Sequence, residues 1–162
     1  MLPITPLAPA DRAEWERLFR SYNGFSGRDV AQAAYDRAWA EIMAGARLHA
    51  LGARVDGGLA GFAHFVTHPS VAGPDVCYLE DLFTDEAARR RGAGRALIAA
   101  VGAWARGQGC ARLYWLTHED NALARALYDN VAVRSGFIEY EVTLGPGGRD
   151  GDPCSPPPRE LR

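Results

Sequence analysis

Hydrophobic positions in the first third of the chain repeat at helical spacing. The stretch PADRAEWERLFRSY has apolar side chains every three or four residues, which predicts an amphipathic helix. These are Trp15, Leu18, Phe19 and Tyr22. Asp11 and Glu14 have the spacing of a helix-capping box. After a break at NGFSGRD, the stretch VAQAAYDRAWAEIMAGA predicts a second helix that ends near Gly45.

From Leu48 onward the pattern changes to strands. LHALGARV and LAGFAHFVTH predict a hairpin, since the DGG between them is a tight-turn signal. VCYLEDLFT predicts a further strand, and a helix of roughly Gly92 to Arg106 follows it. CARLYWLT, NALARALYDNVAVRSG and FIEYEVTL then predict a strand, a helix and a strand that closes the sheet, and ITPL adds a first edge strand. This order indicates an α+β or mixed α/β fold, a sheet layered with helices.

Composition favours one globular domain. The chain has 162 residues, of which 48% are hydrophobic and 23% charged, enough for one sizeable core. We assign residues 1–145 to this domain and 146–162 to a tail rich in Gly and Pro. There is no long apolar run, and the start MLPITPLAPADRAEW lacks signal-peptide features, so we expect no membrane association and a cytoplasmic location.

Charge and residue usage exclude several classes of chemistry. The net charge of −2 gives no general reason to bind nucleic acid. Lysine is absent, because all 18 basic residues are arginine, and this excludes a Schiff-base lysine and a P-loop lysine. The three cysteines are scattered, so we expect neither disulfides nor a zinc finger. His64 and His68 would lie ~13 Å apart on a strand, too far apart for one ion, and we predict no metal.

An arginine triplet and a Gly-x-Gly stand where a strand gives way to a helix. The backbone amides of Gly92, Ala93 and Gly94 are then among the unpaired donors of a helix N-terminus. With Arg89 to Arg91 beside them they suit an anion such as a phosphate. The stretch lacks the third glycine of a dinucleotide fingerprint. Taken alone, the stretch is better explained as a solvated arginine face before an ordinary helix.

The wider neighbourhood resembles a known family. YLEDLFTDEAARRRGAGRALI, followed by LYWLTHEDNALARALYDNVAVRSGFIEYEV, resembles the GNAT superfamily of acyl-CoA-dependent N-acetyltransferases. Arg89, Gly92 and Gly94 match its Gln/Arg-x-x-Gly-x-Gly/Ala signature. A second landmark matches at Asn121, Ala124, Leu127, Tyr128, Gly136 and Phe137. The motifs look most like the histone and polyamine acetyltransferase branch, and the resemblance spans roughly Leu48 to Leu144.

The resemblance implies a fold, a cosubstrate and a homodimer. The fold is a three-layer, mostly antiparallel twisted sheet of six or seven strands with about four helices, splayed between the fourth and fifth strands. The cosubstrate is acetyl-CoA, and no metal is implied. Its contacts would come from the strand and helix motifs: Leu82, Phe83, Thr84, Arg89, Arg90, Arg91, Gly92, Ala93, Gly94, Arg95, Ala96, Asn121 and Tyr128.

The family's chemistry assigns catalytic roles to a few residues. An alkylamine has a pKa of about 10, so a base must remove its proton. Glu80 matches the acidic residue with this role in some similar polyamine acetyltransferases, Tyr128 the general acid, and Leu82 a strand amide for the oxyanion. Period-two alternation predicts that Glu80 and Asp81 face opposite sides, with Asp81 in a salt bridge to the arginines. Without the family, Asn121 is explained as an N-cap and Tyr128 as a packed side chain.

The expected acceptor is a small-molecule amine, because carboxylates gather at the ends of two predicted strands. A polyamine or an amino acid comes first and a protein lysine second. Candidate acceptor contacts are Tyr22, Phe25, Tyr35, Asp81, His118 and Glu119. Two alternatives stay open: a non-catalytic acyl-CoA-binding module, and an enzyme acting on aminoacyl-tRNA, which the net charge disfavours.

Overall fold

The computed structural model describes residues 2–25, 27–88, 91–142 and 144. Within these residues the strands are β1 (Ile4–Pro6), β2 (His49–Val55), β3 (Gly58–Ser70), β4 (Gly73–Thr84) and β5 (Arg112–Tyr114). The α-helices are α1 (Arg12–Phe25), α2 (Gln32–Ala44), α3 (Ala93–Gly107) and α4 (Ala122–Tyr128). Single 3₁₀ turns at Pro9–Asp11 and Glu86–Ala88 precede α1 and follow β4. None of the helices described is long and apolar enough to cross a bilayer.

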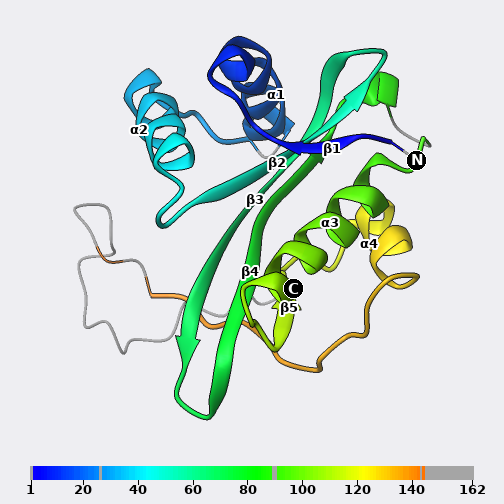
Figure 1. Ribbon diagram of the computed structural model, residues 1–162. Coiled ribbons are helices and arrows are strands. Elements are labelled where there is room, and N and C mark those ends of the chain that lie inside the picture. Colours follow the sequence, from blue (N-terminus) through cyan, green and yellow to red (C-terminus); the bar gives the residue numbers. More distant parts are fainter. Residues whose placement is uncertain (1, 26, 89–90, 143, 145–162) are drawn as a thin grey trace. The chain divides into compact units, whose positions relative to one another are not determined.

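The five strands form one sheet in sequential order, β1-β2-β3-β4-β5. Neighbours pair antiparallel except β4 and β5, which are parallel. Helices α1 and α2 cover one face of the sheet, and α3 and α4 lie on the other (Figure 1). This confirms the α+β class, with five strands in the described residues rather than the six or seven expected.

The hairpin between β2 and β3 follows its local sequence signal. Asp56 and Gly57 both have positive φ, 52° and 88°, as a two-residue type I′ turn requires. The prediction of a capping box at the start of α1 is wrong, because Asp11 and Glu14 accept hydrogen bonds from other backbone amides. Asp11 accepts a hydrogen bond from the Ala8 amide at 2.8 Å, and Glu14 accepts one from the Leu59 amide at 2.6 Å. Glu14 therefore ties α1 to the start of β3 rather than closing its own helix.

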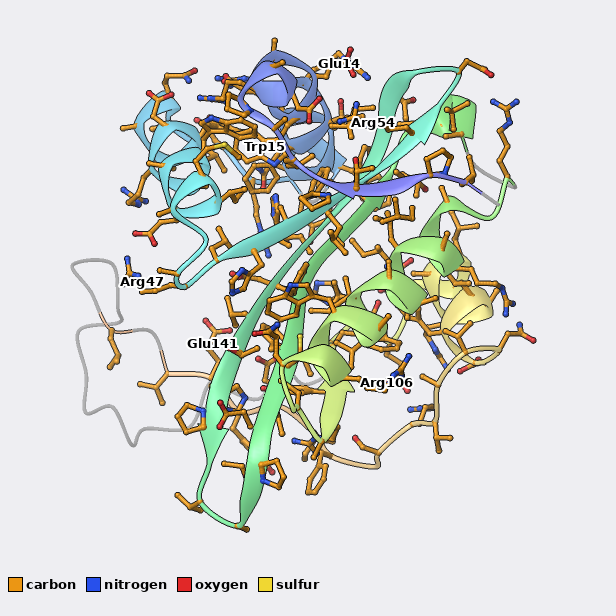
Figure 2. All side chains as sticks on the ribbon, in the orientation of Figure 1. Glu14, Trp15, Arg47, Arg54, Arg106 and Glu141 are labelled. Carbon is orange, nitrogen blue, oxygen red and sulfur yellow. The ribbon has the colours of Figure 1, made fainter. Side chains whose placement is uncertain are left out.

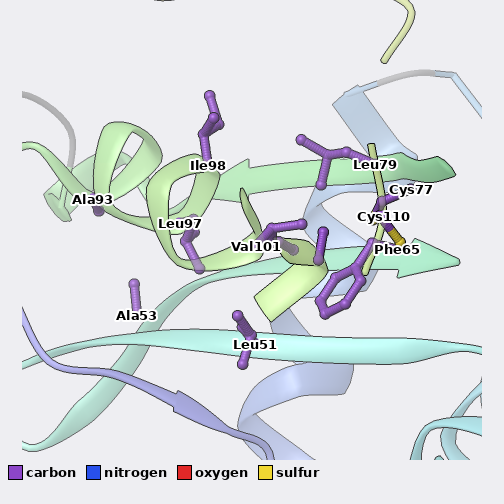
Figure 3. Close-up of a cluster of buried hydrophobic side chains, with 12 residues drawn as sticks. Leu51, Ala53, Phe65, Cys77, Leu79, Ala93, Leu97, Ile98, Val101 and Cys110 are labelled. Carbon is purple, nitrogen blue, oxygen red and sulfur yellow. The ribbon is translucent and has the colours of Figure 1, made fainter. Parts of the chain in front are cut away.

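The sheet separates two hydrophobic clusters. Below α3, Leu97 and Val101 project onto the sheet towards Leu51, Phe65 and Leu79 (Figure 3). On the opposite face, Trp15 and Leu18 of α1, both fully buried, pack with Leu59 and Phe62 of β3 and with Tyr35 and Ile42 of α2. One face of β3 therefore packs towards α1 and α2 and the other towards α3, because successive side chains of a strand point to opposite faces of the sheet.

The predicted closing strand FIEYEVTL is absent from the part of this segment that the structure describes. Phe137–Val142 and Leu144 have no regular secondary structure, and this stretch falls in a unit, Val133 onward, separate from the compact unit Met1–Ala132. Phe137, Tyr140 and Leu144 are 85%, 89% and 90% exposed. A strand needs a partner strand for its backbone hydrogen bonds, and alternation of apolar residues supplies none by itself. The proposed tail, residues 146–162 with Cys154, lies entirely outside the described residues.

Candidate active site

A β-bulge in β4 brings two neighbouring carboxylates to one side of the sheet. His64 of β3 pairs with Asp81, whereas the next residue, Phe65, pairs with Leu79, so Glu80 is an extra residue in β4. A bulge of this kind reverses the alternation beyond it. Glu80 and Asp81 consequently line the same pocket, and the predicted opposite orientation is wrong. Leu79 and Leu82, on either side of them, both face the hydrophobic cluster between α3 and the sheet, called here the α3 cluster.

The pocket lies between the sheet and the α1–α2 pair and has a volume of about 370 Å³. Its charged members are Glu80, Asp81 and Arg28, which comes from the connection between the two helices. Aromatic and small side chains form much of the remaining wall: Phe19, Tyr22, Tyr78, Ala34 and Ala38. The pocket therefore offers two anionic groups, one cation and apolar surface to a ligand.

The pKa values of the two carboxylates move in opposite directions. Partial desolvation at the pocket wall and the adjacent Asp81 charge raise the pKa of Glu80. Burial also opposes ionisation of Asp81, but hydrogen bonds from His64 and Tyr22, with the charge of Arg28, outweigh it and lower the pKa of Asp81. Such a divergence separates a proton-accepting group from one that stays ionised.

Asp81 is embedded in a hydrogen-bond network rather than in the predicted salt bridge with the arginine triplet. It is 9% exposed, and its Oδ2 lies 2.9 Å from Nδ1 of His64. The Tyr22 hydroxyl also hydrogen-bonds to the Asp81 carboxylate. Arg91, the described member of the triplet, instead approaches Asp56 at 3.4 Å. Arg89 and Arg90 lie outside the described residues.

The sheet is open beside the bulge. β5 pairs with β4 only from Val76 to Tyr78, so among the described residues no strand pairs with the β5-facing edge of β4 from Leu79 to Thr84. Leu82, Phe83 and Thr84, the predicted pantetheine contacts, lie on this edge and are half-buried. An uncovered strand edge accepts an extended ligand as an added strand. Pairing between the fourth and fifth strands thus stops after three residue pairs, at the place of the predicted splay.

The start of α3 presents an anion-binding geometry. Gly92 is the N-cap, has φ 81° and ψ 10°, and supplies no side-chain cap, so the first-turn amides of α3 have no side-chain acceptor from it. Ala93 is buried, Gly94 and Ala96 are half-buried and Arg95 is exposed. A Cβ on Gly94 would lie 3.0 Å from Cδ2 of Leu127, so this glycine lets α3 and α4 approach closely. This geometry suits a phosphate group.

Helix α4 supplies Asn121 and Tyr128 at its two ends. It is shorter than predicted, since a turn follows Tyr128. Asn121 is the N-cap and accepts a hydrogen bond from the Ala124 amide at 3.3 Å. Tyr128 packs edge-on against Trp115, and burial raises the pKa of its phenol.

The remaining predicted acceptor contacts do not line the pocket. Phe25 is 78% exposed. Tyr35 is 2% exposed in the hydrophobic cluster between the sheet and helices α1 and α2, and its hydroxyl accepts a hydrogen bond from Asn23 at 3.3 Å. His118 and Glu119 are exposed between β5 and α4. Of the six residues predicted, Tyr22 and Asp81 are thus the two at the pocket wall. No group of three or more His, Cys, Asp or Glu in the described ranges is arranged to hold a metal ion.

Comparison with known proteins identifies the family. Residues 13–131 match the Acetyltransferase (GNAT) family. The chain belongs to this family.

Relatives of this GNAT protein act on small amines. A D-amino-acid N-acetyltransferase of Saccharomyces cerevisiae is 29% identical over 150 residues, covering 85% of the chain and 88% of the yeast protein. An aminoglycoside N(6′)-acetyltransferase type 1 of Salmonella typhimurium is 32% identical over 108 residues, 64% of the chain and 72% of that enzyme. An AAC(6′)-Iy structure with a CoA-containing bisubstrate analogue has the same fold, with a TM-score of 0.77, 23% identity and coverage of 90% and 99%.

The sequence did not point to Arg28 at the pocket wall, nor to His64 and Trp15, which are linked to Asp81 behind the wall by hydrogen bonds. Trp15 was explained by helix periodicity, and His64 was considered only as a metal ligand. One signal for the bulge was present, because Leu79 and Leu82 stand three apart in a strand pattern, whereas side chains on one face of a regular strand stand two apart.

Proposed function

We propose that this protein transfers the acetyl group of acetyl-CoA to the primary amine of a small molecule by direct attack in a ternary complex. The observation that carries the proposal is the pair Glu80 and Asp81, turned into one pocket by the bulge, beside the uncovered edge of β4. Acceptor and acyl donor can therefore meet at the bulge, from the pocket and from the strand edge. The protein is then an enzyme of the acyltransferase class.

Acetyl-CoA supplies an activated thioester, and the residues that would hold it follow from the site. The α3 first turn, from Gly92 to Ala96, takes the pyrophosphate, with Arg89 to Arg91 as further phosphate contacts. Leu82, Phe83 and Thr84 bind the pantetheine arm through their main chain. Asn121 lies beside this arm, and the Leu82 amide stabilises the oxyanion.

Proton transfer is divided between Glu80 and Tyr128. Glu80 accepts the proton of the acceptor ammonium, directly or through water. Its raised pKa brings the carboxylate closer to the working pH of a general base. Tyr128 donates a proton to the departing thiolate, and its raised pKa keeps the phenol protonated until then. The Tyr128 ring packs edge-on against Trp115.

The pocket favours an amino acid over a larger polycation. Glu80 and Asp81 suit an ammonium group, and Arg28 on the same wall suits a carboxylate. Its volume of about 370 Å³ is near the lower end for small-molecule sites. The D-amino-acid specificity of the yeast relative supports this choice. A polyamine is the second candidate, because the two carboxylates alone favour it.

A free-thiol release assay with acetyl-CoA tests the proposal. The panel contains D- and L-phenylalanine, D- and L-lysine, spermidine, neamine, butylamine and a histone-tail peptide. Release with amino acids, weaker for their amides that lack the carboxylate, supports the assignment. Release with spermidine alone would replace the amino acid by a polyamine. No release from any amine, with CoA binding intact by calorimetry, would indicate a binding module. Sedimentation of the full chain tests the expected homodimer.

A further inference from the structure

A buried chain of polar groups crosses from α1 to the pocket. Trp15 projects from α1 into the space between α2 and the sheet (Figure 2), and its Nε1 donates to Nε2 of His64 at 2.8 Å. The other ring nitrogen of His64 lies 2.9 Å from Asp81 Oδ2. Trp15 is 0% exposed and His64 2%, so water does not compete for these hydrogen bonds.

The donors and acceptors of this chain have one consistent direction. An indole N–H can only donate, so Nε2 of His64 is the acceptor and carries no proton. The ring proton therefore resides on Nδ1 and points to the Asp81 carboxylate. A second proton on Nε2 would face the Trp15 N–H and break that hydrogen bond. His64 is thus held as a neutral donor, and Asp81 is the ionised member of the pair.

Packing alone gives no reason for a histidine at this position. The ring of His64 lies among Phe19, Phe62 and Trp15, with centroid distances of 4.9, 4.5 and 5.8 Å. An apolar side chain would fill such an aromatic cluster without any polar group to satisfy. The polar chain is explained instead by its end point, because Asp81 is its only member at the pocket wall.

The groups that face Asp81 come from several elements. His64 approaches from β3, Tyr22 from α1 and Arg28 from the α1–α2 connection, and Glu80 is its neighbour in β4. His64 and Tyr22 each donate to the carboxylate. These two donors fix the orientation of the Asp81 carboxylate and leave some of its lone pairs free to accept hydrogen bonds from a ligand.

We propose that Trp15 and His64 are positioning residues that keep Asp81 ionised and aimed into the pocket, where its carboxylate binds the ammonium group of the acceptor. This inference rests on the proposed function. It assigns separate roles to adjacent carboxylates, since Asp81 anchors the ammonium and Glu80 removes its proton. The anchor acts on acceptor binding, so its loss raises the acceptor KM more than it lowers kcat.

Two substitutions of His64 distinguish this role from packing. Asn is expected to place its amide nitrogen near the position of Nδ1 and so still donate to Asp81, whereas Leu fills the site but donates nothing. The inference predicts that His64→Leu raises the acceptor KM about 10-fold and His64→Asn much less, with the acetyl-CoA KM unchanged in both. A purely packing role predicts the reverse order, because Leu suits an aromatic cluster better than Asn.

Two further variants extend the test along the chain. Asp81→Asn keeps the shape of the side chain but removes its charge, and is expected to raise the acceptor KM about 10- to 100-fold. Trp15→Phe removes the donor to Nε2 but leaves the Nδ1 proton of His64 facing Asp81, so it is expected to raise the acceptor KM less than His64→Leu does. If Trp15→Phe does not fold, the two His64 variants carry the test, since both change the same buried site.

An activity-independent measurement separates the inference from the proposed function. Nitrogen-15 NMR of the wild-type histidine rings at neutral pH is expected to show His64 protonated on Nδ1 and not on Nε2, and His64→Leu is expected to shift the Trp15 indole proton. A proton on Nε2 overturns the inference whatever the kinetics. An acceptor KM that His64→Leu leaves unchanged overturns it too. If the tautomer is as expected but no panel amine binds or reacts, the proposed function fails and the anchoring role with it.

Discussion

Glu80 and Asp81 are consecutive in β4, yet both side chains line one pocket, because Glu80 is the extra residue of a β-bulge. A strand without the bulge would have turned one of them into the α3 cluster, where a carboxylate has no polar partner. A single inserted residue thus creates a two-carboxylate site without any insertion in the loops.

Glu80→Gln is expected to lower kcat/KM about 100-fold, because it removes the general base. In the wild type, kcat/KM falls as the pH drops through the raised pKa of Glu80, since only the carboxylate accepts a proton. This fall of kcat/KM at low pH, the acidic limb of the pH profile, is expected to disappear in the variant. Glu41→Gln, in α2 but not among the residues that line the pocket and paired with Arg47, is the matched control and is expected to behave as wild type. An unchanged limb in Glu80→Gln would remove Glu80 from the mechanism.

Tyr128→Phe is expected to lower kcat about 100-fold with little change in the melting temperature. The ring remains packed on Trp115, so mainly the hydroxyl is lost. Tyr114→Phe is the control, because its hydroxyl contacts His68 at 3.0 Å on the exposed part of the sheet. Equal kcat values for the two variants would contradict a role for Tyr128 as acid.

Gly92→Ala is expected to destabilise the fold by about 1 kcal/mol and to raise the KM for acetyl-CoA. Its φ of 81° is unfavourable for any residue with a Cβ. Gly107→Ala, at the end of α3 and with no atom within 4 Å of an added Cβ, is expected to be neutral or slightly stabilising. Chemical denaturation and initial rates measure both effects. A Gly92→Ala protein as stable as Gly107→Ala would argue against the left-handed N-cap.

Asp11→Asn is expected to lower the free energy of unfolding by about 1–3 kcal/mol at neutral pH. Burial opposes ionisation of Asp11, but hydrogen bonds from Arg54 and the Ala8 amide lower its pKa overall. A carboxyl with a lowered pKa contributes stability above its unfolded pKa of about 4 and loses it as the pH falls through the folded value.

The difference between wild type and Asp11→Asn is therefore expected to shrink in acid, which urea titrations at several pH values would show. Asp36→Asn is the control, since Asp36 is 61% exposed in its pair with Arg12 and should matter by less than about 0.5 kcal/mol. A constant difference at all pH values would mean that the Asp11 charge is not involved.

Local chemistry made much of this fold predictable from sequence. Asp56 and Gly57 specify their turn through backbone conformation alone, and Gly92 marks the start of α3 in the same way. The family signature likewise points to β4 and the start of α3. These features depend on residues close together in the chain, so their patterns are visible without a structure.

The remaining features depend on contacts between distant segments. The bulge at Glu80 is a matter of register between β3 and β4, and strand periodicity alone predicts the opposite orientation. The role of His64 depends on Trp15, 49 residues away. The segment FIEYEVTL has the alternation of a strand, but alternation does not specify the strand with which it pairs.

The walls of the pocket and its reacting groups belong to different elements. Ala34 and Ala38 of α2 form part of the wall, whereas the carboxylates are held by the sheet. Substitutions in α2 can therefore reshape the acceptor space while the proton-transfer groups keep their positions. Such a division lets a lineage explore new amines by changing one surface helix, and it makes α2 the first place to mutate when a different acceptor is wanted.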